Sequence, residues 1–270
     1  MSQSRSRSAR SARSVRPGAG PEAAPGVVRL GDPLVNFYLV DHPDGLTLVD
    51  AGLPGQRRRL LDHLAAAGRS PADIRAVLIT HAHPDHTGLT VELQQAGAEV
   101  WVHEDDRAML TDGPRKAMRH ARSERSPLPY LVRRPAALAT MASMARQGAF
   151  TAPPPTRAHT FGDGARLDGV PGRPLAVALP GHTPGSTGFH FPDQGLFFTG
   201  DALVTKEAFT GHTGPCLVCR AFTHDSAAAL ASLDAVAGLS QDTVLLPGHG
   251  QPFADGPREA VALARRFGIR

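Results

Sequence analysis

The chain has 270 residues, of which 41% are hydrophobic, enough to form the core of one large domain. It contains no run of 18 or more apolar residues, so we expect no membrane-spanning helix and no membrane partner. Five arginines stand among the first twenty residues without an acid, and they exceed the whole formal charge of +4. The remaining body is therefore close to neutral, which argues against nucleic-acid binding by the folded domain.

The first 22 residues are rich in arginine and serine and poor in apolar side chains. Such a segment cannot bury enough surface to offset its ordering entropy, so we predict a disordered tail over residues 1–22 and a folded domain over residues 23–270. No apolar stretch follows the basic start, as a secretory signal would require. With only two cysteines in the chain, this favours a cytoplasmic protein without disulfides. The preference for arginine over lysine suits a GC-rich bacterial genome.

Strands rich in β-branched residues alternate with helices along the first hundred residues. The strands are predicted at residues 27–30, 35–40, 46–50, 75–80 and 99–103, and the helices at residues 56–67 and 89–95. The run at 75–80 is continuously apolar, which is typical of a strand that is buried on both faces.

Residues 104–150 differ, because they are rich in arginine, methionine, alanine and proline. We predict two or three short helices there, forming a lid inserted over a site, since long connections in compact domains often serve this purpose. Beyond it, strands are predicted at residues 175–179, 187–191, 195–199 and 244–246, and helices at residues 226–236 and 257–267. Ser226 is the expected N-cap of the first of these helices. The alternation of strands and helices predicts a layered α/β fold.

The segment His81-Ala-His83-Pro-Asp85-His86 places three imidazoles and a carboxylate directly after the buried strand at 75–80. Imidazole and carboxylate groups suit a divalent metal ion, with zinc the first candidate and iron or manganese compatible with the same donors. A catalytic zinc site commonly uses about three protein ligands, so four candidates in one loop point to two metal ions.

Three further candidates each follow a predicted strand in a turn that contains glycine: His182, Asp201 and His249. Loops at strand ends are where α/β scaffolds carry catalytic groups. The preceding glycines at 181, 200 and 248 permit tight turns that direct the next side chain.

These motifs, together with Asp50 in the segment LVDAG, resemble the metallo-β-lactamase superfamily from about residue 27 to residue 252. The resemblance implies an αββα four-layer sandwich with the site at one edge of the two sheets. It places one metal ion on His81, His83 and His182, and the second on Asp85, His86 and His249, with Asp201 bridging the two. It also implies that Asp50 orients a ligand by a hydrogen bond.

Two such ions would share a water, lower its pKa and polarise the attacked oxygen, so that the bridging hydroxide acts as nucleophile. Asp85 could then carry a proton to the leaving group. Most true β-lactamases of this superfamily have a cysteine at the position of Asp201 or lose that ligand. The aspartate resembles the glyoxalase II, lactonase and phosphodiesterase-like branches. Our first expectation is a small-molecule ester, thioester or lactone as substrate.

Three alternatives remain open from the sequence. The first is a phosphodiesterase-like hydrolase. The second is an oxidoreductase that resembles the persulfide dioxygenases, with a single iron on His81, His83, His182 and Asp201. The third is a regulatory protein that binds metal on the same scaffold without catalysis.

Two other patterns allow more than one interpretation. Cys216 and Cys219, flanked by His212 and His224, could hold a structural zinc ion, form a redox pair or belong to a buried strand or helix end. The basic residues of the insertion could attract an anionic substrate or form a solvated helical face. These are Arg115, Lys116, Arg119, Arg122, Arg125, Arg133 and Arg134.

Overall fold

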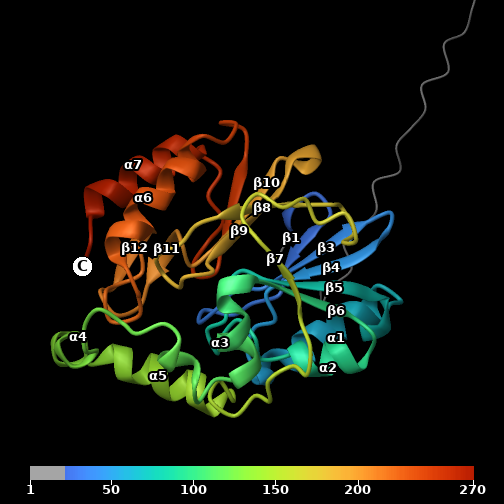
Figure 1. Ribbon diagram of the computed structural model, residues 1–270, viewed down its shortest axis with the longest axis horizontal. Helices are drawn as coiled ribbons and strands as arrows, with labels where there is room; N and C mark the ends of the chain where they lie inside the picture. The colour runs from blue at the N-terminus through green and yellow to red at the C-terminus, as the bar shows by residue number, and fades with distance from the viewer. Residues whose placement is uncertain (1–21) are drawn as a thin grey trace, which may run out of the picture.

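A computed structural model describes residues 22–270 of the chain, built around two main β-sheets that face each other (Figure 1). The predicted tail lies outside the described residues except for Glu22, which begins the first strand. The larger sheet contains β1 to β7 in chain order. These strands are β1 (Glu22–Ala24), β2 (Val27–Arg29), β3 (Tyr38–His42), β4 (Gly45–Val49), β5 (Ile74–Ile79), β6 (Glu99–His103) and β7 (His159–Phe161).

The smaller sheet has the spatial order β13-β10-β9-β8, and a separate hairpin pairs β11 with β12. The strands are β8 (Leu175–Ala178), β9 (Thr187–Phe191), β10 (Leu196–Gly200), β11 (Val204–Glu207), β12 (His212–Cys216) and β13 (Val244–Pro247). Strand β10 runs parallel to β13 and antiparallel to β9, which in turn is antiparallel to β8. Strands β8, β10 and β13 therefore all end at the same edge of their sheet.

Seven α-helices cover the outer faces of the sheets or form the insertion in the described part of the chain. They are α1 (Arg57–Ala66), α2 (Thr90–Gln95), α3 (Arg107–Asp112), α4 (Leu128–Arg133), α5 (Ala136–Arg146), α6 (Ser226–Ala237) and α7 (Pro257–Phe267). Short 3-10 helices lie at Pro54–Gln56, Pro71–Asp73, Glu104–Asp106, Ala117–Arg119 and Pro192–Gln194.

Three apolar clusters separate the layers and confirm the predicted αββα sandwich. One cluster packs the outer face of the larger sheet against α1, α2 and α3. The second fills the space between the two sheets, and the third packs the smaller sheet against α6 and α7. Strand β5 contributes Val77 to the first cluster and Leu78 to the second, so its continuous apolar sequence is indeed buried on both faces.

Some boundaries differ from the sequence prediction for local reasons. Strand β3 begins at Tyr38 because Asn36 instead donates its backbone N–H to Gly248, which ties this segment to the end of β13. Helix α6 has Asp225 as its N-cap, since the carboxylate of this residue accepts from the N–H of Ala228. The prediction of Ser226 as the cap was wrong by one position. Strands β1, β7, β11 and β12 were not predicted.

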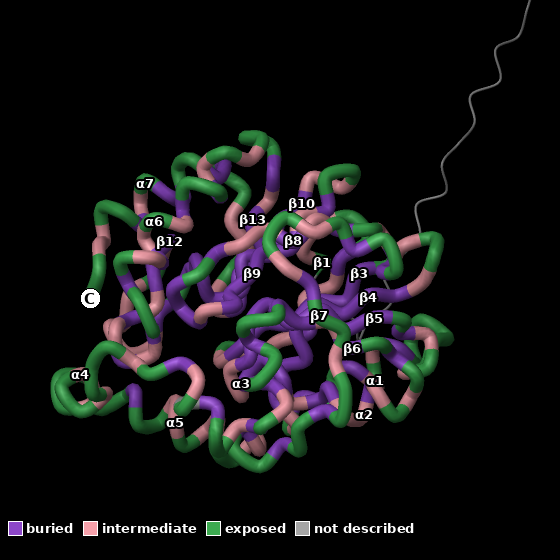
Figure 2. Tube along the Cα trace, viewed as in Figure 1, coloured by how far each residue is buried: buried purple, intermediate pink, exposed green. Residues whose placement is uncertain are grey.

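Helices α3, α4 and α5 lie within residues 104–150 and form the helical insertion of the sandwich. Figure 2 shows that the buried residues gather in the central strands, whereas α4 and α5 are largely exposed or intermediate. Leu128 and Val132 of α4 are among the most exposed large apolar side chains of the described residues. Over residues 22–270, no helix is both long enough and apolar enough to cross a membrane.

Candidate metal centre

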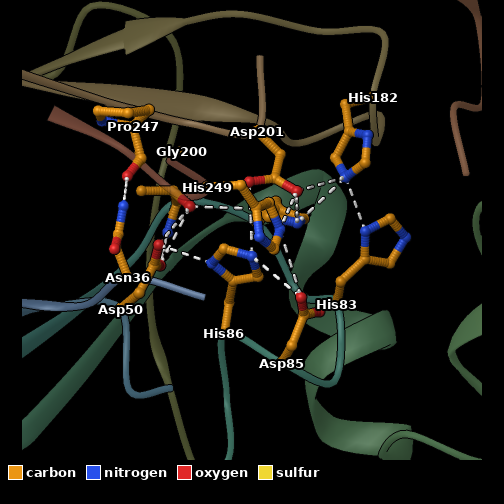
Figure 3. A network of polar contacts seen from close by, with 12 residues as sticks. Asn36, Asp50, His83, Asp85, His86, His182, Gly200, Asp201, Pro247 and His249 are labelled. Atoms are coloured by element: carbon orange, nitrogen blue, oxygen red, sulfur yellow. Dashed lines mark hydrogen bonds and ion pairs between the residues drawn. The ribbon is translucent and has the colours of Figure 1, made fainter. Parts of the chain in front are cut away.

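All seven side chains that the sequence singled out as metal ligands converge at one edge of the sandwich (Figure 3). The loop that follows β5 carries four of them, because this parallel strand ends where the two sheets open towards each other. The turns that follow β8, β10 and β13 bring the other three to the same edge. They comprise His81, His83, Asp85, His86, His182, Asp201 and His249.

The first group consists of His81, His83 and His182. The Nε2 atom of His182 lies 2.8 Å from Nδ1 of His83 and 3.2 Å from Nε2 of His81. Burial is the main reason that the pKa of each imidazole is lowered, and for His182 the pKa falls to about 3. Three neutral imidazoles therefore direct nitrogen atoms at one point, which is the form in which histidine binds a metal ion.

The second group consists of Asp85, His86 and His249. The Oδ2 atom of Asp85 lies 3.6 Å from Nε2 of His86 and 3.4 Å from Nε2 of His249. Burial opposes charge on both imidazoles, but the carboxylates of Asp201 and Asp85 outweigh it, so the pKa of His249 rises to about 10 and that of His86 well above its usual value. Burial alone would raise the pKa of Asp85, yet the two histidines lower it to about 2.

Asp201 lies between the two groups and faces both. Its Oδ2 atom is 3.0 Å from Nε2 of His249 and 3.7 Å from Nε2 of His182, while its Oδ1 atom is 3.5 Å from Nε2 of His86. Figure 3 shows the carboxylate between the imidazoles of both groups. This is the position that a residue shared by two metal ions would require.

Three buried polar atoms of the centre have no hydrogen-bond partner in the described structure: Nδ1 of His182, Nε2 of His86 and Oδ1 of Asp201. A buried polar atom without a partner is costly, by about 1–3 kcal/mol. Nε2 of His86 and Oδ1 of Asp201 face each other across the cluster at 3.5 Å, so a divalent cation there would satisfy both. The donor set of imidazole nitrogen and carboxylate oxygen also fits zinc, iron or manganese.

Asp50 contacts the centre from behind, as the resemblance implied. Its Oδ2 atom accepts from Nδ1 of His86 at 2.9 Å, which leaves Nε2 of that ring directed at the cluster. Its Oδ1 atom accepts from the backbone N–H of Thr80 at 2.8 Å. The hydroxyl of Thr80, in turn, lies 3.1 Å from Nδ1 of His81. Thr80 was not predicted, because a threonine at a strand end has no distinctive sequence signal.

Asp106 is a second residue that the sequence did not reveal. Its buried carboxylate accepts from the N–H of Ala82 at 2.9 Å, the hydroxyl of Thr183 at 2.8 Å and the N–H of Gly185 at 2.8 Å. It thereby joins the loop that carries His81 and His83 to the loop that carries His182.

The turn that carries His249 is held from the other side of the sandwich. The side-chain amide of Asn36 donates to the carbonyl oxygens of Pro247 at 2.9 Å and Gly250 at 2.8 Å. The Nδ1 atom of His249 contacts the carbonyl oxygen of Leu34, so Nε2 is free to face Asp85 and Asp201.

The cysteine motif is not part of this centre. Cys216 and Cys219 are both buried, and burial raises the pKa of each thiol, to about 12 for Cys216. His212 stacks on Phe267 and His224 contacts the carbonyl oxygen of Arg122. Across the described chain, neither cysteine belongs to a group of three potential metal ligands. The contacts therefore favour the interpretation as a buried strand end.

A cavity of about 370 Å³ opens directly onto the cluster, with His83, Asp85, His182, Asp201 and His249 in its wall. Most of the other wall residues are apolar, and they come from the loop before β3, the insertion and the segments around β11 and β12. They include Leu34, Met141, Met144, Phe150, Phe209 and Phe222. Among the wall residues of the described chain, Lys206 is the one lysine or arginine, and none of the basic residues of the insertion reaches the cavity.

The fold and the histidine–aspartate cluster together define a protein with a candidate metal centre at one edge of an αββα sandwich. The sequence profile of the Metallo-beta-lactamase superfamily matches residues 30–249. The chain belongs to this superfamily.

Individual relatives support the same assignment. The chain is 28% identical to the probable metallo-hydrolase YflN of Bacillus subtilis over 254 residues, which cover 89% of each chain. It is 27% identical to the hydroxyacylglutathione hydrolase GloC of Haemophilus influenzae, over 78% of this chain and 82% of the relative. Among solved structures, TTHA1623 in a di-iron-bound form matches with a TM-score of 0.61 at 27% identity, over 86% of this chain and 96% of the other.

Proposed function

We propose that this protein is a hydrolase that binds two divalent metal ions and cleaves an ester, thioester or lactone with water. The observation that carries the proposal is that the cluster contains one triad of His81, His83 and His182 and another of Asp85, His86 and His249. A third triad, His81, His86 and Asp201, connects them, and Asp201 also lies within 4 Å of His182 and His249. In this proposal His81, His83 and His182 hold one ion, while Asp85, His86 and His249 hold the other. The similarity to a hydroxyacylglutathione hydrolase supports a thioester or related acyl substrate.

When bound, the ions would lower the pKa of a water and polarise the carbonyl oxygen under attack. The side chains of the protein supply the remaining tasks. Asp85, whose pKa is held near 2, is ionised at neutral pH and can accept a proton from the water and pass it to the leaving group. Asp50 and the carbonyl of Leu34 fix the orientation of the imidazoles of His86 and His249.

Zinc is our first proposal for the metal, since it suits a site of imidazole and carboxylate ligands that performs hydrolysis. Iron is the alternative metal, because a structurally similar protein has been solved with two iron ions. The apolar cavity wall favours an acyl substrate over a phosphodiester, whose charge would call for more cations than Lys206 alone.

The first experiment is elemental analysis of protein purified without chelators and without a histidine tag. Wild type should carry close to two metal ions per chain, and His249→Ala close to one. His120→Ala is the matched control, because this histidine pairs with Asp112 outside the cluster, and it should keep the wild-type content. The metal-loaded protein is then assayed on thioester, ester, lactone and phosphodiester substrates.

The alternative outcomes are distinct. One iron ion in both wild type and His249→Ala would overturn the two-metal proposal and point to the dioxygenase-like chemistry, for which thiols and persulfides with oxygen are the test. Full metal content without turnover on any of the four substrate classes would favour a regulatory protein. Turnover confined to the phosphodiester would replace the acyl substrate.

A further inference from the structure

The cavity beside the metal centre has a more specific chemistry than hydrolysis requires. Its floor contains the polar groups of the cluster, but its walls are built mostly from apolar side chains, with Thr140, Lys206 and Glu207 as the exceptions. At about 370 Å³ it lies within the range of sites that enclose a small organic ligand. Hydrolysis at the metal centre does not require an apolar wall, because a cavity lined with glycines or polar side chains would accept a small hydrophilic substrate equally well.

One wall is formed by the insertion. Met141 and Met144 of α5 line the cavity, and Phe150 stands at the point where this wall meets solvent, with 43% of its surface exposed. Methionine side chains adapt their shape to an apolar partner. The end of this wall is tied to the main domain, because Gln147 accepts from the backbone of Gly55 at 2.9 Å and donates to Asp32 at 3.1 Å.

The opposite wall comes from the turn after β11 and the segment after β12. The rings of Phe209 and Phe222 lie 4.4 Å apart at an angle of 49° and both face the cavity. The buried carboxylate of Glu207 accepts from the N–H of Phe209 at 3.1 Å and also from that of Thr210, which holds this turn in place. Both apolar walls are therefore preformed, so an apolar ligand would meet them without first ordering the chain.

We infer that this cavity binds the acyl chain of the substrate, and that the enzyme prefers an unbranched apolar acyl group of several carbons over an acetyl group. The inference rests on the proposed function, because it places the scissile carbonyl at the metal centre and the chain between the two apolar walls. Hydrolysis breaks the bond between the carbonyl carbon and sulfur or oxygen, adds the elements of water, and yields a carboxylate and a thiol or alcohol.

The first test uses thioesters of one leaving group, N-acetylcysteamine, with acetyl, butyryl, hexanoyl and octanoyl chains. Each buried methylene should raise kcat/KM about threefold to fourfold until the cavity is filled. We expect hexanoyl to exceed acetyl by at least about tenfold, allowing for incomplete burial. Release of the thiol is followed with a chromogenic disulfide.

Two substitutions on the same helix provide a matched pair. Met141→Gln places an amide in the cavity wall and should lower the ratio of hexanoyl to acetyl turnover by about threefold or more. Leu138→Gln, one turn earlier on α5, changes a side chain that is 53% exposed and lies outside the cavity wall, so it should leave this ratio unchanged. A ratio lowered equally by both variants would attribute the effect to the helix and overturn the inference.

A binding measurement separates the inference from the proposed function. Calorimetric titration with butyrate and octanoate should give tighter binding of octanoate by about thirtyfold or more, with the difference reduced in Met141→Gln. If octanoate binds in this way while no thioester is cleaved, the acyl site stands and the proposed hydrolysis fails. If thioesters are cleaved at rates independent of chain length, hydrolysis stands and the acyl site is refuted. Equal weak binding of both acids would also refute it.

Discussion

Asp50→Asn tests how far the metal centre depends on a residue that touches no metal. Asp50 has a φ of +59°, a left-handed conformation that asparagine tolerates better than most residues, so the backbone can persist. The asparagine oxygen can still accept from the N–H of Thr80. Its amide group then faces Nδ1 of His86 as a donor, so the proton of a neutral imidazole must move to Nε2. That is the atom directed at Asp85 and Asp201.

The expected loss of metal affinity follows from the hydrogen bond between Asp50 and His86 that the substitution removes. A hydrogen bond to a charged group is worth about 1.5–3 kcal/mol, and removal of such a partner from a metal-binding histidine typically lowers affinity about 10- to 100-fold. The two figures agree, since a hundredfold corresponds to about 2.8 kcal/mol. His81, His83 and His182 keep their own contacts. We therefore expect one of two metal ions to bind 10- to 100-fold more weakly, while the other changes by less than about threefold.

Titration of metal-free protein with zinc against a chromogenic chelator measures both affinities, and urea unfolding of the metal-free protein provides the control for folding. Two zinc ions bound with wild-type affinities would refute the role of Asp50. If the affinities for both zinc ions fall equally in a protein of normal stability, the two groups of ligands do not bind their ions separately.

Four further predictions follow from the described structure. The raised pKa values of His86 and His249 keep both imidazoles protonated at neutral pH in the absence of metal. Zinc binding at pH 7 should therefore release about two protons, which an indicator dye measures, and zinc binding to His249→Ala should release fewer. The free energy of unfolding of the metal-free protein should decline as pH rises from about 6.5 towards 10. An unfolded histidine loses its proton near pH 6.5, whereas folded His249 keeps its proton until its pKa of about 10. Stability that increases over this range would refute the ion pairs of His249 with Asp85 and Asp201. Gly248→Ala should lower metal content and cut kcat/KM by about tenfold or more, because a Cβ there would collide with Asp201 Oδ1 and His86 Cε1; wild-type values would show that the turn can yield. Cys216 and Cys219 should resist Ellman's reagent at pH 8 until the protein is unfolded, and Cys216→Ala should keep the wild-type metal content; rapid labelling of native protein would contradict their burial.

The convergence of the ligand residues could be predicted because each of them follows a strand that the sequence pattern predicts. The apolar run before His81 and the glycines before His182, Asp201 and His249 mark turns at strand ends, and parallel strands end at one edge. Strands of three residues, such as β1 and β7, escaped prediction because so few side chains carry no detectable period. Strand β1 pairs with β2, the next strand along the chain, whereas β7 pairs with β6, which is distant in sequence.

Supporting residues such as Asp106 and Asn36 could not be predicted for a different reason. Asp106 stands in a run of three acids, and nothing in the sequence distinguishes the buried carboxylate from its exposed neighbours Glu104 and Asp105. Its role arises only when the loops of His81 and His182 approach each other and leave N–H groups to be satisfied. Such roles are properties of the tertiary structure, and a single sequence shows the residue type without the partner.

The basic insertion illustrates how composition can mislead about substrate. Its basic residues allowed two interpretations, an attraction for anions or a solvated face. The side chains that it contributes to the cavity wall carry no charge: Pro114, Ala117, Thr140, Met141, Met144 and Phe150. The seven basic residues lie at positions 115–134, before α5, and none of them lines the cavity. Burying an unpaired guanidinium is costly, and it is the apolar Met141 and Met144 of α5 that face the cavity. Under the proposed function, the ligand motifs would determine the reaction, whereas residues 104–150 and the turn at Phe209 would determine which acyl group reaches it. Changes in these two segments should therefore alter substrate preference while the metal content remains that of the wild type.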